Sequence, residues 1–249
     1  MDCQLEKTCK KGGPYLIFIQ NLYGINMLPH CLFQYSGIEA FDLLEYDGSL
    51  TVEEIKQYGH FGLGCFNSLD GELIAFDHHF FHATSNGNLK PALPNSLISC
   101  AYMVNFAPLF NIRQPLNFAL ADLPSIVKTH FSHPGQPFYA LRIEATFDKI
   151  SVRSVPAQKR PYPPMEEVVK HQALFDFESI QGVLIGFHFP NYLKGLTYAG
   201  FHLHFVSSDF QHGGHILDFS AKEGTISLDP IESYYNLLPD YARQSSFKI

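Results

Sequence analysis

Apolar and polar residues alternate along much of this chain with the two-residue period that is typical of β-strands. The longest example covers residues 138–147, where the intervening positions include Arg142 and Glu144. Because successive side chains of a strand point to opposite faces, such a pattern predicts sheets with one face packed against a core. Further strands are expected at residues 15–19, 32–36, 96–106, 149–155, 182–189, 196–207, 225–228 and 232–237.

Helical spacing of apolar residues is less frequent. It occurs at residues 38–44, 116–131 and 165–171. A Thr51-x-x-Glu54 pattern also resembles a capping box, which predicts a helix from Thr51 to about Tyr58. Strands therefore outnumber helices, and the expected fold class is α/β (mixed α+β), dominated by β-sheet and arranged in two lobes.

Prolines concentrate in one place, between residues 156 and 164, which makes this stretch the best linker candidate. We accordingly expect an N-terminal arm with a first strand at 1–30, a β-rich lobe at 31–155 and a C-terminal lobe at 156–249.

The C-terminal lobe contains the most informative pattern in the chain, Phe201-His202-Leu203-His204-Phe205. On a strand, His202 and His204 point to one face and the three apolar residues to the other. The polar, glycine-containing run at 207–214 is typical of a hairpin connection, and His215 follows it. A symmetric hairpin places His215 opposite His204, with Cβ atoms roughly 5 Å apart.

Three converging imidazoles with one open position are typical of a catalytic Zn²⁺ site. A single histidine on a strand is more often packed or solvated, and this chain has 13 histidines. A cupin-like metal site is an alternative, with Asp209 as a further ligand. Its expected glycine spacing is absent, however, and the third histidine follows His204 too closely.

Composition narrows the class of protein. The 249 residues carry a net charge of −7, which gives no electrostatic basis for binding nucleic acid or an anionic membrane. No apolar run approaches the ~20 residues of a spanning helix, and we expect a cytoplasmic protein. The five cysteines form no CxxC pair, which favours reduced thiols.

Several short motifs occur in an order that resembles the α-acetolactate decarboxylase family, over residues 32–239. They are Gln34-Tyr35-Ser36, Tyr46-Asp47-Gly48, Gly62-Leu63-Gly64, Leu69-Asp70-Gly71-Glu72-Leu73, Phe138-Tyr139-Ala140, Arg142-Ile143, Arg153-Ser154-Val155, Lys159 through Pro163, and His202-Leu203-His204-Phe205 with Gly213-Gly214-His215.

The resemblance implies a two-lobed fold in which His202, His204 and His215 hold Zn²⁺, with no other cofactor. It identifies Glu72 and Arg153 as active-site residues. The implied reaction converts (S)-2-acetolactate, a 2-hydroxy-3-oxo acid, to (R)-acetoin and CO₂ for acetoin biosynthesis. In that reaction Arg153 would orient the carboxylate and Glu72 would transfer protons. A homodimer is also implied.

Two departures from the family pattern stand out. Cys65 occupies a position where the family usually has threonine, and a thiol is a weaker hydrogen-bonding group than a hydroxyl. Family members also tend to bring a second glutamate back in a C-terminal tail, whereas the tail at 240–249 contains none. A catalytically impaired zinc-binding protein of the same fold is therefore a further alternative.

Overall fold

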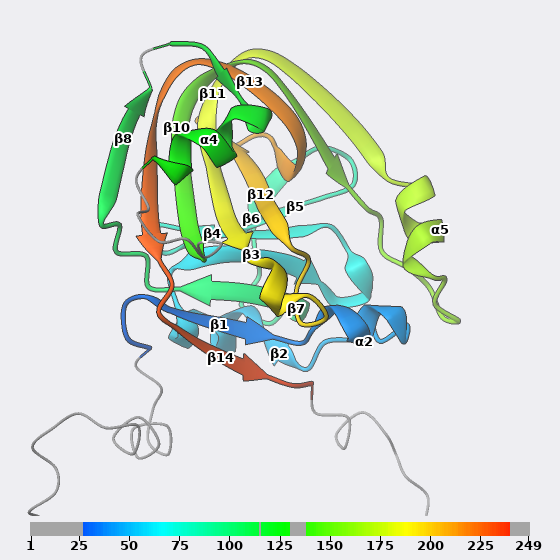
Figure 1. The fold of residues 1–249 in the computed structure, drawn as a ribbon. Helices are drawn as coiled ribbons and strands as arrows, with labels where there is room; N and C mark the ends of the chain where they lie inside the picture. Colours follow the sequence, from blue (N-terminus) through cyan, green and yellow to red (C-terminus); the bar gives the residue numbers. More distant parts are fainter. Residues whose placement is uncertain (1–26, 115, 130–137, 240–249) are drawn as a thin grey trace, which may run out of the picture.

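The chain forms two β-sheets accompanied by a few short helices (Figure 1). The computed structural model describes residues 27–114, 116–129 and 138–239. The strand expected at 15–19 lies outside these ranges, as does the tail at 240–249. The prediction of a mixed fold dominated by β-sheet is confirmed.

The first sheet has eight strands in the order β14-β1-β7-β3-β4-β5-β6, with β2 beside β7. All pairs are antiparallel except β1 with β14, which is parallel. The strands are β1 (Cys31–Tyr35), β2 (Leu50–Thr51), β3 (Phe61–Phe66), β4 (Glu72–Phe76), β5 (His79–Ala83), β6 (Leu89–Pro91), β7 (Leu97–Val104) and β14 (Ser233–Leu237).

The second sheet has six strands, and four of them close into a ring. β10 pairs with β11 along one edge and with β13 along the other, while β12 joins β11 to β13. The strands are β8 (Phe110–Gln114), β9 (Phe118–Ala119), β10 (Tyr139–Ser154), β11 (Ala173–Phe189), β12 (Gly200–Ser207) and β13 (Gly213–Pro230).

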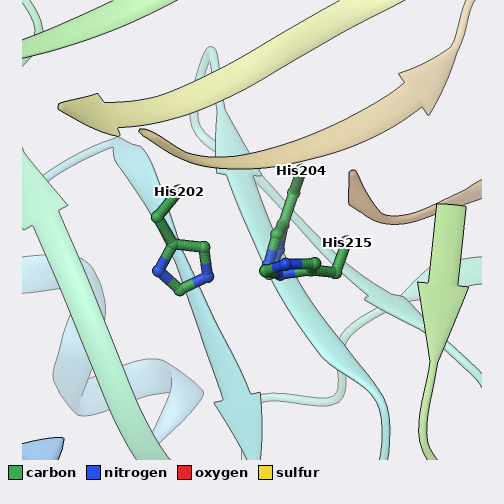
Figure 2. A group of neighbouring side chains, drawn as sticks. All are labelled: His202, His204 and His215. Carbon is green, nitrogen blue, oxygen red and sulfur yellow. The ribbon is translucent and has the colours of Figure 1, made fainter. Parts of the chain in front are cut away.

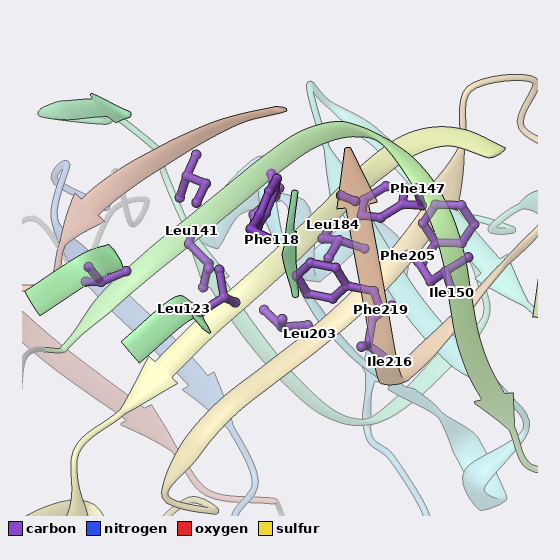
Figure 3. Packing of buried hydrophobic residues seen from close by; sticks show 14 of the residues in the cluster. Phe118, Leu123, Leu141, Phe147, Ile150, Leu184, Leu203, Phe205, Ile216 and Phe219 are labelled. Atoms are coloured by element: carbon purple, nitrogen blue, oxygen red, sulfur yellow. The ribbon is translucent and has the colours of Figure 1, made fainter. Parts of the chain in front are cut away.

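The second sheet encloses an apolar core of aromatic and aliphatic side chains (Figure 3). Phe147 is fully buried in it, with its ring edge-on to Phe205 and Phe219 at centroid distances of 5.7 and 5.6 Å. Leu203 and Phe205 face this core, as the alternation in β12 predicts. The same alternation turns His202 and His204 the other way, out of the core.

A second cluster packs the two sheets against each other. It joins residues of β3 and β4, such as Phe61 and Ile74, to Phe187 of β11 and Val206 of β12. The histidine face of β12 is thereby held against the first sheet, which places the candidate site between the sheets.

The helices are short: α2 (Ile38–Asp42), α3 (Val52–Ile55), α4 (Leu123–Lys128) and α5 (Met165–Lys170). The capping box is confirmed, because Thr51 Oγ1 accepts from the Glu54 amide and Glu54 Oε2 accepts from the Thr51 amide. A 3₁₀ turn (Lys56–Tyr58) then completes the predicted segment. The helix expected at 116–131 is wrong in extent, because residues 118–119 instead pair with β13 as β9.

The strands expected at 138–147 and 149–155 are a single strand, β10. Asp148 separates the two alternating patterns in the sequence. It is an extra residue relative to β13, where the register shifts, whereas the register against β11 continues across it. A β-bulge absorbs such an extra residue without ending the strand. β10 therefore runs without interruption from Tyr139 to Ser154, and it carries Arg153 to the candidate site.

The domain boundary expected at residue 155 stays a prediction. Each of the two sheets, however, contains strands from both sides of this residue. The second sheet takes β8 to β10 from before it, and the first takes β14 from after it. The proline-rich stretch is also bound to the first sheet's loops: the Gln158 amide donates to the Ser68 carbonyl at 2.7 Å, and the Tyr46 hydroxyl to the Pro163 carbonyl at 2.8 Å. Among the described residues, no helix is long and apolar enough to cross a membrane.

Candidate metal centre and active site

The β12–β13 hairpin has the register that its symmetry predicts, with His204 directly opposite His215. Its connection is held by Asp209, whose Oδ1 accepts from the Ser207 hydroxyl at 2.6 Å and from the Gln211 amide at 3.1 Å. Asp209 is thus a turn residue, and the further-ligand role required by a cupin-like site is wrong for it.

The three imidazoles converge, as Figure 2 shows. Ring centroids are 5.2 Å apart for His202 and His204, 5.0 Å for His202 and His215, and 5.3 Å for His204 and His215. One nitrogen from each ring lies within 4.8 Å of the other two, so the group can hold a metal ion.

His204 is oriented by the first sheet. Its Nδ1 lies 3.0 Å from the Leu73 carbonyl, which can only accept, so Nδ1 carries the proton and Nε2 is an acceptor. That Nε2 is buried and has no hydrogen-bond partner among the described residues. A backbone carbonyl on one ring nitrogen and an unpartnered second nitrogen are the arrangement of a metal-binding histidine.

The electrostatic environment keeps these rings neutral. Burial lowers the pKa of His202 to about 4, helped by the positive charge of Arg153. Burial and the neighbouring imidazoles also lower the pKa of His204 and of His215 well below the usual range. Because a metal needs the unprotonated ring, the three side chains are in the form that binds it.

Glu72 begins β4 directly after the Asp70-Gly71 turn, where Gly71 has a positive φ of 72°. Its Oε2 is 3.6 Å from His204 Nε2. Burial raises the pKa of this carboxyl to about 7, against the opposing effect of Arg153. Both protonation states are therefore populated near neutral pH, which suits a general acid or base.

Arg153 lies near the end of β10, in register with His215 of β13. One guanidinium nitrogen, Nη1, donates to Gln172 Oε1 at 3.1 Å. Its Nε is buried and has no hydrogen-bond partner among the described residues. The guanidinium thus retains an unused donor, and its planar fork of donors is suited to a carboxylate.

Four of these groups border one cavity of about 350 Å³. Its polar wall contains Glu72, Arg153, His202 and His215. A larger and more open hollow of about 660 Å³ lies over the second sheet, where Arg142 is neutralised by Asp77 and Glu144. We assign the chemistry to the smaller cavity, because it contains the converging polar groups.

The remaining walls of the cavity include Cys65, already noted as a departure from the family pattern, and several residues that were not expected from the sequence. These walls are formed by Phe41, Gly64, Cys65, Leu69, Cys100, Val155, Met165, Val169, Tyr198 and Phe201. Met165 and Val169 are four residues apart in the α5 region, a spacing that indicates one shared helix face. The sequence therefore indicates the shared face of Met165 and Val169, but it does not indicate which residues that face packs against.

Comparison with known proteins agrees with this geometry. The family model described as alpha-acetolactate decarboxylase matches residues 32–248. The chain belongs to the α-acetolactate decarboxylase family. It is 37% identical over 211 residues to the alpha-acetolactate decarboxylase of Methylococcus capsulatus, covering 85% of this chain and 81% of that protein.

Two further α-acetolactate decarboxylases give the same result. The Brevibacillus brevis protein is 38% identical over 214 residues, which cover 84% of this chain and 73% of that one. The crystal structure of the Bacillus subtilis protein superposes with a TM-score of 0.81 at 32% identity, covering 84% of this chain and 89% of the other. The family and its fold thus exclude the cupin-like alternative.

Proposed function

We propose that this protein decarboxylates (S)-2-acetolactate to (R)-acetoin and CO₂, with zinc as its metal. The observation that supports this most directly is a cavity bordered by His202, His215, Glu72 and Arg153, where His204 completes the histidine group, in a member of the α-acetolactate decarboxylase family. The catalytic and metal-binding roles of these residues are part of the proposal.

The three histidines would hold the zinc ion through one ring nitrogen each. When bound, zinc supplies a Lewis acid beside the substrate oxygens and so lowers the energy of the negative charge that develops there. The unpartnered Nε2 of His204 and the low pKa of all three rings support this assignment.

Arg153 would bind the substrate carboxylate. Its guanidinium is a planar cation, and Gln172 accepts a hydrogen bond from one of its nitrogens. Placing the carboxylate there fixes the scissile carbon–carbon bond relative to the histidines. Proximity of this kind contributes a large part of the rate of many enzymes.

Glu72 would handle the protons. When the carbon–carbon bond breaks, CO₂ leaves and the bonding electron pair remains on the substrate as an enolate. A carboxyl with a pKa of about 7 can donate the proton that converts this enolate to the ketone and can then take up another from water. The apolar walls from Phe41 and Met165 limit water around the reacting carbon.

The test is acetoin formation from racemic 2-acetolactate by zinc-loaded wild type, His204→Ala and His79→Ala. His79 is an exposed histidine of β5 and serves as the matched control. Wild type and His79→Ala should form acetoin, whereas His204→Ala should lose both zinc and turnover. Stoichiometric zinc without acetoin above the spontaneous background would instead favour the catalytically impaired zinc-binding protein. The homodimer and the cytoplasmic location remain predictions.

A further inference from the structure

Two thiols lie side by side in the wall of the candidate active site. Cys65 of β3 is in direct register with Cys100 of β7 on one side and with Glu72 of β4 on the other. Residues directly paired across antiparallel strands share a face of the sheet. The side chains of Cys100, Cys65 and Glu72 therefore form a row, and all three border the cavity.

The geometry of this pair is close to that of a disulfide. The two Sγ atoms are 3.2 Å apart, and both cysteines are free thiols. A disulfide needs a sulfur–sulfur distance of about 2.0 Å and Cα atoms about 4.4–6.8 Å apart. Directly paired residues of antiparallel strands have Cα atoms about 4.5–5.5 Å apart. Side-chain rotation alone can thus bring the sulfurs into bonding distance.

We propose that Cys65 and Cys100 are a redox modification site that closes to a reversible disulfide on exposure to a peroxide. In the first step the Cys100 sulfur attacks the peroxide, the O–O bond breaks, and the products are a sulfenic acid and water. The Cys65 sulfur then displaces hydroxide from that sulfenic acid, which forms the S–S bond and releases a second water. Two thiols are oxidised and one hydrogen peroxide is reduced to two waters.

The different burial of the two thiols indicates which of them reacts first. Cys100 is half-buried, whereas Cys65 is buried. The hydrogen bond with Cys100 and burial hold the pKa of the Cys65 thiol well above its usual range, so this thiol is a poor first nucleophile. Cys100 meets the oxidant first, and the proximity of Cys65 then favours the second step over further oxidation.

Closure of the disulfide would change the site beside Glu72. Bond formation draws the Cys65 sulfur toward Cys100 and away from the carboxyl that is its neighbour on the other side. A displacement of about 1 Å near reacting atoms can lower a rate about 100-fold. We therefore expect the oxidised protein to turn over at least about tenfold more slowly. This consequence, unlike the disulfide itself, rests on the proposed decarboxylase function.

The test uses the full chain with Cys3, Cys9 and Cys31 changed to serine, which leaves only the two cavity thiols. After hydrogen peroxide treatment and alkylation, mass spectrometry should find neither thiol alkylated and a peptide pair joined through Cys65 and Cys100. Dithiothreitol should restore both thiols. Adding Cys65→Ser or Cys100→Ser should abolish the linkage.

Three outcomes would overturn the proposal: both thiols remain open to alkylation, only one sulfur gains oxygen, or the disulfide joins two protein molecules. A parallel assay of acetoin formation tests the consequence. A reduced protein that makes no acetoin would overturn the proposed function, while the mass data still decide the disulfide. A disulfide that leaves the rate unchanged would overturn its effect on catalysis alone.

Discussion

A methyl group added at Gly186 tests how tightly the second sheet holds the proposed metal centre. Gly186 lies in β11, paired with Leu203 of β12, between the two histidines of that strand. A Cβ atom built at Gly186 falls 2.0 Å from the carbonyl oxygen of His202. Real contacts of this kind are not shorter than 3.0 Å, so β12 would have to retreat by about 1 Å.

The size of the effect follows from this displacement. Overpacking of a well-packed sheet typically costs about 1–3 kcal/mol of stability. Metal sites tolerate ligand displacements of only about 0.2 Å, and a disturbed supporting shell typically lowers metal affinity about 10–100-fold. Gly186→Ala should therefore lose zinc affinity by at least about tenfold while it remains folded.

Zinc affinity is measured by competition with a chelating dye, and stability by urea unfolding. Gly37→Ala is the matched control, because its new Cβ has no neighbour closer than 3.8 Å. A Gly186→Ala protein with wild-type zinc affinity and unchanged stability would show that β12 is not fixed by its close contact with β11, and the reasoning would fail.

Three further predictions concern individual ionisable groups. Glu72→Gln should lower kcat about 10²–10⁴-fold at unchanged zinc content, because the amide cannot transfer the proton; full activity would exclude Glu72 as the acid. Arg153→Lys should lower kcat/KM about tenfold or more, because the planar fork is lost, and steady-state kinetics with zinc analysis separates this from loss of metal. In metal-free protein, burial lowers the pKa of the triad, that of His202 to about 4. Between pH 6.5 and 4 the unfolded chain thus binds protons that the folded chain excludes. The histidine contribution to stability is complete above pH 6.5 and falls on acidification, by about 2 kcal/mol at pH 5 for His202 alone. Glu72, with its pKa raised to about 7, contributes in the opposite sense, so the measurement uses the Glu72→Gln protein. Equal urea midpoints of the Glu72→Gln protein at pH 7.5 and pH 5 in EDTA would contradict this.

Local patterns in the sequence predict local structure well in this chain. The register of His204 with His215 follows from a symmetric hairpin, because strand alternation and turn length leave few other arrangements. The capping box at Thr51 and the Asp70-Gly71 turn are likewise set by residues adjacent in the chain. Each of these features depends on short-range geometry.

Features that depend on distant residues could not be predicted in this way. The Leu73 carbonyl that orients His204 is 131 residues away, and any residue would offer the same carbonyl. The partnership of Cys65 with Cys100 depends on the register of β3 and β7, which no local pattern encodes. The assignment of Arg153 to the site came from family resemblance, because a single arginine on a strand is usually a surface residue.

The parallel pairing of β1 with β14 has a consequence for how the chain folds during synthesis. Cys31 pairs with Ser233 and Tyr35 with Leu237, so the two strands lie side by side in Figure 1 although they are far apart in sequence. Contacts of such long range slow folding. During synthesis, one backbone edge of β1 stays unpaired until nearly all of the described chain has been made, because its partner β14 comes last among the described strands. Exposed edges of this kind promote aggregation, so the final strand protects the first from intermolecular pairing.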